Sequence, residues 1–210
     1  MTDVVIPIKS LAEAKGRLRP VLSADERPRL VLAMLRDVLT TLRQSKVGNI
    51  WLVASDDAVF DLGSEFRARS LRETTPLGYN AAVSLGLGAI PRDTSVLVLP
   101  GDVPLVQPAD ITALTGATGD VRIAADHLGL GTNGLFLSSP ELINPRFGPT
   151  SLKDHAADAQ SKGLAACRLV LPGLVHDIDT PDDLARLARA TFKGAATRFL
   201  RSIRPVEGAA

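Results

Sequence analysis

The sequence predicts an α/β domain with a parallel β-sheet, and three observations lead to this fold class. Short apolar runs alternate along the chain with segments whose apolar residues recur at helical spacing. The run at 96–99 has no charge and is rich in β-branched residues, as expected of a strand buried on both faces of such a sheet. The chain has 210 residues, 45% of them hydrophobic, which is enough for one sizeable domain.

The apolar runs give the positions of the strands. We predict strands at 4–8, 50–54, 96–99 and 121–125, one shortly before residue 74, one after the glycines that precede residue 135, and one at 165–171. The last contains Cys167, the only cysteine, which we expect to be buried in the strand rather than to act as a nucleophile. A single cysteine also excludes a disulfide within the chain.

Capping signals and helical spacing give the positions of the helices. Ser23 and Glu26 have the spacing of a capping box, and the helix after them shows one apolar face. Further helices are predicted up to about residue 88, from 110, from Ser151 and from Pro181, where Thr180 would be the N-cap. The apolar face of the first helix consists of Leu30, Met34, Val38 and Leu42. Two acids in the first turn of the last helix, Asp182 and Asp183, are read as structural.

Charge and composition exclude several classes of function. The formal net charge is +1, so nothing indicates a nucleic acid or a membrane as partner. Because there is no basic leader and no apolar window of about 18 residues, we expect a cytoplasmic protein. A zinc site and a serine hydrolase are disfavoured, since the histidines lack ligand spacing and no Gly-x-Ser-x-Gly motif occurs. The three histidines are His127, His155 and His176.

A sharp turn follows the strand predicted at 96–99. The segment 100–104 contains two prolines and a glycine, so the strand cannot continue through it. Ligands of open α/β sheets bind beyond the carboxyl ends of the strands, which makes Asp102 in this turn a candidate ligand of a divalent metal. The alternative is that Asp102 only forms an Asx turn, and the turn by itself favours neither.

A basic loop follows the first predicted strand and contains Lys9, Lys15 and Arg17. Such a loop can bind phosphates through backbone N–H groups and cationic side chains. It is not a P-loop, because the Gly-Lys-Ser/Thr ending is missing. A solvated basic loop is the alternative, and this segment taken alone favours it.

Three polar residues have two interpretations each. Thr132 lies among glycines and can offer its hydroxyl to an anion, although Gly-x-Gly alone is weak support. Ser151 either caps its helix or helps to bind a carboxylate or phosphate at the helix start. Asn80 is either a helix cap or a contact to a nucleotide.

Asp177 and Asp179 alternate on an extended segment, so both side chains can face one site. With Asp102 they form a set of hard oxygen ligands, which suits Mg²⁺. Such acids, together with cations near a strand end, are typical of nucleotidyl transfer. The tail at 192–210 is basic, and we assign it no function.

The ordered motifs are more specific than any one of them. They are Ile6-Pro7-Ile8-Lys9 with Ala14-Lys15-Gly16-Arg17-Leu18, Gly101-Asp102-Val103-Pro104, Gly131-Thr132-Asn133, Arg146-Phe147-Gly148-Pro149 with Ser151, and Asp177-Ile178-Asp179-Thr180-Pro181. In order and approximate spacing they resemble the CofC/FbiD family, guanylyltransferases of deazaflavin coenzyme F-420 biosynthesis. The resemblance implies a single Rossmann-like domain at 1–191 of the nucleotide-diphospho-sugar transferase (GT-A-like) fold, with a mixed, mostly parallel sheet and helices on both faces.

The resemblance also implies a reaction and its residues. GTP would react with phosphoenolpyruvate, 2-phospho-L-lactate or 3-phospho-D-glycerate, and pyrophosphate would leave. Mg²⁺ would be held by Asp102, Asp177 and Asp179, and the phospho-acid by Thr132, Gly148 and Ser151. The nucleotide would be bound by Lys9, Lys15, Arg17, Asn80 and Gly101. The catalytic residues would be Asp102, Lys15 and Lys9.

The resemblance leaves several points open. Tyr79 stands where a leucine is expected and His127 where a basic residue is common, so the identity of the acid is open. Transient contact with a downstream deazaflavin transferase is implied, and a homodimer is one option for the oligomeric state.

Three other functions are considered. A molybdenum-cofactor nucleotidyltransferase would have a Gly-Gly-rich first loop, and this chain lacks the glycine pair. A non-catalytic nucleotide-binding module would not need three aspartates. A glycosyltransferase acting on a nucleotide sugar would have Asp-x-Asp after a middle strand, which Gly101-Asp102-Val103 is not.

Overall fold

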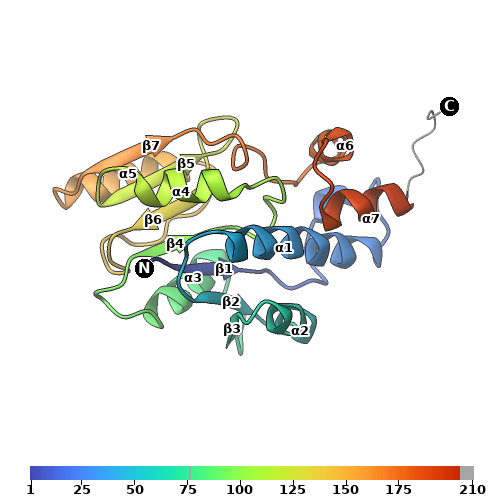
Figure 1. The fold of residues 1–210 in the computed structure, drawn as a ribbon, viewed down its shortest axis with the longest axis horizontal. Helices are drawn as coiled ribbons and strands as arrows, with labels where there is room; N and C mark the ends of the chain where they lie inside the picture. Colours follow the sequence, from blue (N-terminus) through green and yellow to red (C-terminus); the bar gives the residue numbers. More distant parts are fainter. Residues whose placement is uncertain (76, 204–210) are drawn as a thin grey trace.

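The computed structural model describes residues 1–75 and 77–203 of the chain (Figure 1). In this part a seven-stranded sheet lies between helices that cover both of its faces. The strand order is β3-β2-β1-β4-β6-β5-β7. Four strand pairs are parallel, and the two pairs made by β6 are antiparallel. The predicted α/β fold with a mixed, mostly parallel sheet is therefore confirmed.

Every predicted strand is present, with small shifts of its ends. The strands are β1 (Asp3–Pro7), β2 (Ile50–Ala54), β3 (Arg69–Arg72), β4 (Val96–Val98), β5 (Val121–Ala125), β6 (Thr132–Leu137) and β7 (Ala166–Leu169). The prediction that Cys167 is buried is wrong. Because β7 is the edge strand of the sheet, its residues alternate between exposed and half-buried, and Cys167 is half-buried.

The helices include all of the predicted ones in the predicted order, with two more, one after the second strand and one in the basic tail. They are α1 (Glu26–Gln44), α2 (Asp57–Glu65), α3 (Tyr79–Gly88), α4 (Pro108–Gly116), α5 (Ser151–Ser161), α6 (Pro181–Arg189) and α7 (Ala195–Ile203), with a short 3₁₀ helix at Gly16–Leu18. Before α1, Ser23 N donates to Glu26 Oε2 and Glu26 N donates to Ser23 Oγ, as in the predicted capping box. Thr180 caps α6 as predicted, and Asp183 completes a second capping box.

Alternation along the central strands produces one apolar core on each face of the sheet. Val4 and Ile6 of β1 pack on the face covered by α1, α2 and α4, whereas Val5 packs on the face covered by α3 and α5. The contact between α3 and β1 is close, since a Cβ on Gly86 would lie 2.4 Å from Val5 Cγ1. The neighbouring strands β1 and β4 are thus buried on both faces, and they fix the positions of the loops that follow them.

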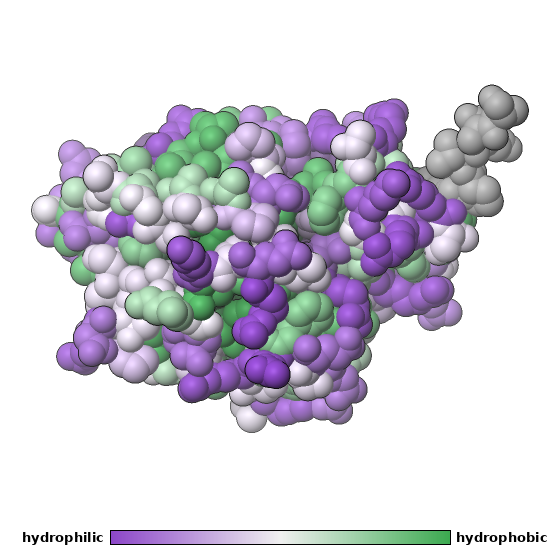
Figure 2. Space-filling view, viewed as in Figure 1, coloured by the Kyte–Doolittle hydropathy of each residue, from purple (hydrophilic) through white to green (hydrophobic). Residues whose placement is uncertain are grey.

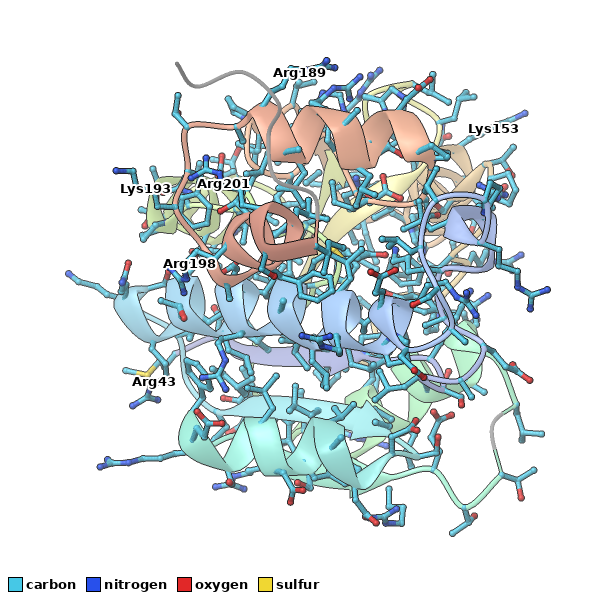
Figure 3. The ribbon with its side chains drawn as sticks, turned by 90° about the vertical axis from the view of Figure 1, so that its right-hand side faces the viewer. Arg43, Lys153, Arg189, Lys193, Arg198 and Arg201 are labelled. Atoms are coloured by element: carbon cyan, nitrogen blue, oxygen red, sulfur yellow. The ribbon has the colours of Figure 1, made fainter. Side chains whose placement is uncertain are left out.

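Part of the basic tail folds onto the domain as α7. The carboxylate of Asp37 on α1 accepts hydrogen bonds from the N–H groups of Ala195 and Ala196 at 2.5 and 2.9 Å. It thus provides acceptors for two N–H groups in the first turn of α7, which have none within the helix. Hydrophilic residues gather over α6 and α7 (Figure 2). Lys193, Arg198 and Arg201 are exposed around α7, while Lys153 of α5 lies on the opposite side of that view (Figure 3).

One edge of the sheet collects the loops that contain the motifs. The carboxyl ends of β1, β2, β3 and β4 meet there because these strands are parallel. β6 runs in the opposite direction, so its first residues, Thr132 and Asn133, lie at the same edge. β5 and β7 also end there. Within the described residues, no helix has the length and apolar character needed to cross a membrane.

Candidate active site

A cleft of about 600 Å³ opens at this edge of the sheet. One side is formed by the loop after β1 and by the acidic turns after β4 and before α6, and the other side by the start of β6 and the segment before α5. Its lining includes Lys9, Lys15, Arg17, Tyr79, Gly101, Asp102, Thr132, Asn133, Phe147, Gly148, Ser151, Asp177 and Asp179. A ligand cleft at the carboxyl ends of strands is the usual arrangement in open α/β sheets.

Asp102, Asp177 and Asp179 converge on the acidic side of the cleft. Each offers a carboxylate oxygen, and these atoms lie within 4.8 Å of one another. The two segments are joined by a backbone hydrogen bond from Ile178 N to Asp102 O at 3.1 Å. Both acids of 177–179 face one site, as the sequence predicts, and this site lies beside the turn after β4.

Lys15 lies between two of these acids. Its Nζ donates to Asp102 Oδ2 at 2.6 Å and to Asp179 Oδ1 at 2.7 Å, and only 7% of its side chain is exposed. The backbone of Lys15 is left-handed, with φ 55° and ψ 41°. This conformation costs a non-glycine residue about 1 kcal/mol or more. The ion pairs with Asp102 and Asp179 offset the cost of this backbone conformation and hold Lys15 in place.

The pKa shifts describe the charge balance of the acidic side. Burial alone would lower the pKa of Lys15, but Asp102 and Asp179 outweigh it and raise the pKa to about 12. Burial, together with the charges of Asp102 and Asp179, raises the pKa of Asp177. One ammonium thus faces three crowded carboxylates. An excess of negative charge on hard oxygen ligands fits a divalent cation.

The other side of the cleft, called the neutral side below, holds more deeply buried hydroxyl groups, and one charged residue, Asp126, lines the cleft beside them. Thr132 is 7% exposed and Ser151 is 1% exposed. Thr132 Oγ1 lies 3.1 Å from Nδ1 of His155, which is completely buried on α5. The first turn of α5 is joined to the segment before β6 by Leu152 N, which donates to Leu130 O. Apart from Asp126, this side therefore offers hydroxyl and backbone groups rather than charges.

Gly148 lies in the segment before α5. A Cβ at this position would meet no protein atom within 4 Å, and its φ is not positive. The fold therefore does not require glycine at 148, and the absence of a side chain leaves open space at the cleft.

The structure brings most of the predicted nucleotide-binding residues together. Lys9, Lys15, Arg17 and Gly101 line the cleft. A Cβ on Gly101 would lie 2.4 Å from Ile8 Cδ1, so this glycine lets the loop after β1 approach the Asp102 turn. The binding roles of these residues stay predictions.

Asn80 lies beside the cleft; its interpretation as a helix cap is wrong, and its contact to a nucleotide stays a prediction. Its Nδ2 donates to Phe147 O at 3.0 Å and its Oδ1 accepts from Phe147 N at 2.7 Å. The N-cap of α3 is Gly78, and Asn80 is not among the residues that line the cleft. Asn80 therefore holds the segment that carries Gly148.

Three further residues of the site were not singled out from the sequence. Asn133 donates to Leu174 O and, at 3.4 Å, to Asp177 Oδ1, so it orients one of the acids. Phe147 packs edge-on against Tyr79 and His155. His155 could have been noticed because it follows Ser151 by four residues, which places both on one helix face.

The two departures from the family pattern have different positions. Tyr79 lines the cleft, and burial, with the charges of Asp102 and Asp177, raises the pKa of its hydroxyl. His127 does not line the cleft; its ring lies 5.1 Å from that of His176.

Comparison with known proteins identifies the family of this chain. The model of the family described as "Guanylyl transferase CofC like" matches residues 2–207. A phosphoenolpyruvate guanylyltransferase of Roseiflexus castenholzii is 36% identical over 206 residues, which are 98% of this chain and 96% of the relative. One of Conexibacter woesei is 39% identical in an alignment 208 positions long, which covers 93% of this chain and 92% of the relative.

A solved structure supports the fold. A protein from Desulfovibrio desulfuricans G20, assigned as a nucleotide-diphospho-sugar transferase, superposes with a TM-score of 0.74 over 96% of this chain and 95% of its own, at 16% identity. At that identity the likeness bears on the fold, which is therefore of the nucleotide-diphospho-sugar transferase type. Taken with the match over nearly the whole sequence, these findings mean that the chain belongs to the CofC-like guanylyl transferase family.

Proposed function

We propose that this protein is a cytoplasmic, Mg²⁺-dependent guanylyltransferase that transfers GMP from GTP to the phosphate of phosphoenolpyruvate. The observation that carries the proposal is one cleft with two unlike sides, in a chain of the CofC-like family. Three acids and a lysine form one side, and buried hydroxyls beside an open glycine form the other. Two anionic substrates can bind there next to each other.

The reaction needs no nucleophile from the protein. A phosphate oxygen of the acid forms a bond with the α-phosphorus of GTP, and the bond between that phosphorus and the oxygen bridging to the β-phosphorus breaks. The products are guanylylated phosphoenolpyruvate, with a new diphosphate link, and pyrophosphate. Positioning and electrostatic stabilisation account for catalysis in such reactions.

The residues of the cleft divide the work between them. Lys9, Lys15 and Arg17 neutralise the phosphates of GTP, which lowers the repulsion between the two anions. Thr132, Gly148 and Ser151 hold the acid through hydroxyl and backbone groups. A magnesium ion held by Asp102, Asp177 and Asp179 would supply positive charge to the phosphate oxygens.

The names of the relatives support phosphoenolpyruvate as the acid. The relatives from Roseiflexus and Conexibacter are both named phosphoenolpyruvate guanylyltransferases. By the same reasoning the product would enter coenzyme F-420 biosynthesis, where a downstream transferase joins it to a deazaflavin.

The test is pyrophosphate release with Mg²⁺, using each of the four common nucleoside triphosphates with each of the three acids. Because the product can be labile, the downstream transferase and its deazaflavin acceptor are added, and the trapped product is identified by mass. We expect turnover with GTP and phosphoenolpyruvate. Preference for another nucleotide would overturn the guanylyl assignment, and preference for another acid would overturn the substrate. GTP binding without turnover in any combination would favour a binding module.

A further inference from the structure

A buried histidine lies behind the cleft and has no part in the mechanism above. His155 is on α5, one helical turn after Ser151, and is completely buried. Both ring nitrogens have hydrogen-bond partners. Nδ1 lies 3.1 Å from Thr132 Oγ1, and Nε2 lies 3.0 Å from the backbone nitrogen of Arg146. The ring therefore joins two segments that line the cleft.

These partners fix the tautomer of the ring. The backbone N–H of Arg146 can only donate, so Nε2 accepts and holds no proton. Burial lowers the pKa of His155 to about 4, against the opposing charges of Asp154 and Asp158, so the ring is neutral near neutral pH. The single ring proton is consequently on Nδ1, which donates to Thr132 Oγ1.

The tautomer in turn fixes the direction of the Thr132 hydroxyl. Its oxygen accepts the hydrogen bond from His155 Nδ1, so its own proton is available for another acceptor. Among the described residues, Thr132 Oγ1 has no side-chain partner except His155, and Thr132 lines the cleft. The hydroxyl is thus left to donate to an oxygen atom of a ligand.

The same ring holds the segment that carries Gly148. Arg146 N is bonded to its Nε2, and the ring of Phe147 packs against it at 4.9 Å with an interplanar angle of 72°. Asn80 fixes the backbone of Phe147 from the other side. The position of Gly148 therefore depends on the acceptor nitrogen of His155.

We infer that His155 is a positioning residue for the phosphorylated acid. Its Nδ1–H fixes the Thr132 hydroxyl as a donor to an oxygen of the acid, and its Nε2 holds the segment that carries Gly148 in place. The inference rests on the proposed function, because the acid is the ligand assigned to this side of the cleft. His155 acts through Thr132 and Gly148 and does not touch the reacting atoms.

Two substitutions separate the two bonds of the ring. In His155→Gln the amide oxygen reaches the position of Nε2, so the acceptor for Arg146 N is kept while the donor to Thr132 is lost. In His155→Asn the amide nitrogen takes the position of Nδ1, so the donor is kept while the acceptor is lost. Thr132→Val removes the hydroxyl at nearly constant volume.

The variants are compared by the KM for phosphoenolpyruvate. We expect Thr132→Val and His155→Gln each to raise it about tenfold, with the KM for GTP within about twofold of wild type. Thr132→Val should add nothing further to His155→Gln, because both remove the same oriented donor. Added to His155→Asn it should still raise the KM about tenfold. Multiplying effects in the Gln background, or equal changes in both KM values, would overturn the inference.

Nitrogen-15 NMR of the histidine side chains tests the tautomer without substrate. We expect a neutral His155 with its proton on Nδ1, and a proton on Nε2 would overturn the inference even if the enzyme assay succeeds. Calorimetric titration of wild type with each of the three acids tests the ligand. If none binds although the tautomer is as expected, the proposed function and the acid assignment fail together, and the hydrogen-bond assignment stands.

Discussion

The two sides of the cleft differ in how they are built. On the acidic side, the side chains of Asp102 and Asp179 are 27% and 43% exposed. Both are bound by Lys15, which lies 164 residues before Asp179 in the chain. On the neutral side, Thr132, Ser151 and His155 are at most 7% exposed and are bonded within β6, α5 and the segment before α5. The first side can rearrange around an incoming cation, whereas the second is formed in advance.

This difference in burial affects how readily the groups on each side can change their partners. Charges placed at a partly exposed edge can exchange one cation for another, because water and side-chain motion reduce the cost of doing so. Buried hydroxyl and imidazole groups cannot reorient without leaving a polar group unpaired. We therefore expect the acidic side to govern catalysis and cation binding, and the neutral side to govern recognition of the acid.

The largest expected effect comes from Asp102→Asn. Removal of this charge takes away both a partner of Lys15 and a proposed ligand of the metal, so turnover should fall at least about 100-fold. The fold should survive, because the asparagine has nearly the same shape. Pyrophosphate release and thermal unfolding measure the two effects. Asp182→Asn, in an exposed acid of α6 outside the cleft, is the control. Near-wild-type turnover of Asp102→Asn would refute the metal assignment.

The neutral side should show itself in the pH dependence of stability. The pKa of His155 is lowered from 6.5 to about 4, chiefly by burial, with Arg146 adding to the shift and Asp154 and Asp158 opposing it. Between these pH values the unfolded chain takes up a proton that the folded chain refuses. The contribution of the neutral His155 ring to the free energy of unfolding is therefore fully present above pH 6.5. It is lost as the pH drops toward 4, which lowers the free energy of unfolding by up to about 3 kcal/mol.

Urea unfolding at about pH 7.5 and about pH 4.5 measures this loss. His155→Gln should lose less stability over the same interval, since the carboxylates titrate equally in both proteins. An equal loss in the two proteins would mean that the buried ring is not the group responsible.

Lys15→Met tests whether the acidic side exchanges cations. The ammonium of Lys15 occupies Asp102 and Asp179, so its removal should raise the affinity for Mg²⁺ or Mn²⁺ about tenfold in the absence of nucleotide. Turnover should fall, because a phosphate contact is lost. Calorimetric titration gives the affinity, and Lys9→Met, from the same loop, is the comparison. Weaker cation binding by Lys15→Met would mean that the lysine orients the acids instead of competing for them.

The smallest expected effect is that of Thr180→Ala. Thr180 and Asp183 form the capping box of α6, and Asp183 Oδ2 also accepts Asp179 N at 3.3 Å. Loss of the cap should cost about 1 kcal/mol of unfolding free energy. Cation binding should weaken while binding of the acid is unchanged. Ser23→Ala removes a comparable cap from α1 without touching the cleft, so it should cost similar stability and leave cation binding alone. Equal cation affinities in both variants would contradict the link between this cap and Asp179.

The parts that the sequence predicts are those with a local physical signal. Charge-free runs identify the strands, and capping boxes identify the starts of α1 and α6. The rule that ligands bind beyond strand ends marks Asp102, and the alternation of an extended segment pairs Asp177 with Asp179. That the three act together is implied by the resemblance to the family, and they do converge in the structure. The antiparallel insertion of β6 between β4 and β5 has no such signal in the residues themselves.

The parts that it does not predict depend on partners distant in the chain. Asn80 has two local interpretations, but both of its polar atoms bind the backbone of Phe147, 67 residues away. Helical spacing places Ser151 and His155 on one face, yet it does not say that Thr132 lies opposite. The pairing of Lys15 with Asp179 is likewise a property of the folded chain.

The distance along the chain between Lys15 and Asp179 has a consequence for biosynthesis. β1 is synthesised before the other six strands of the sheet, and it lies in the centre of the sheet between β2 and β4. The loop after it, which carries Lys15, gains its second carboxylate only when nearly the whole domain has been translated. A nascent or prematurely terminated chain that ends before Asp179 would thus have a basic loop without the second of its two counter-ions. The order of synthesis itself delays the completed cleft until the C-terminal segment has folded back onto the first strand.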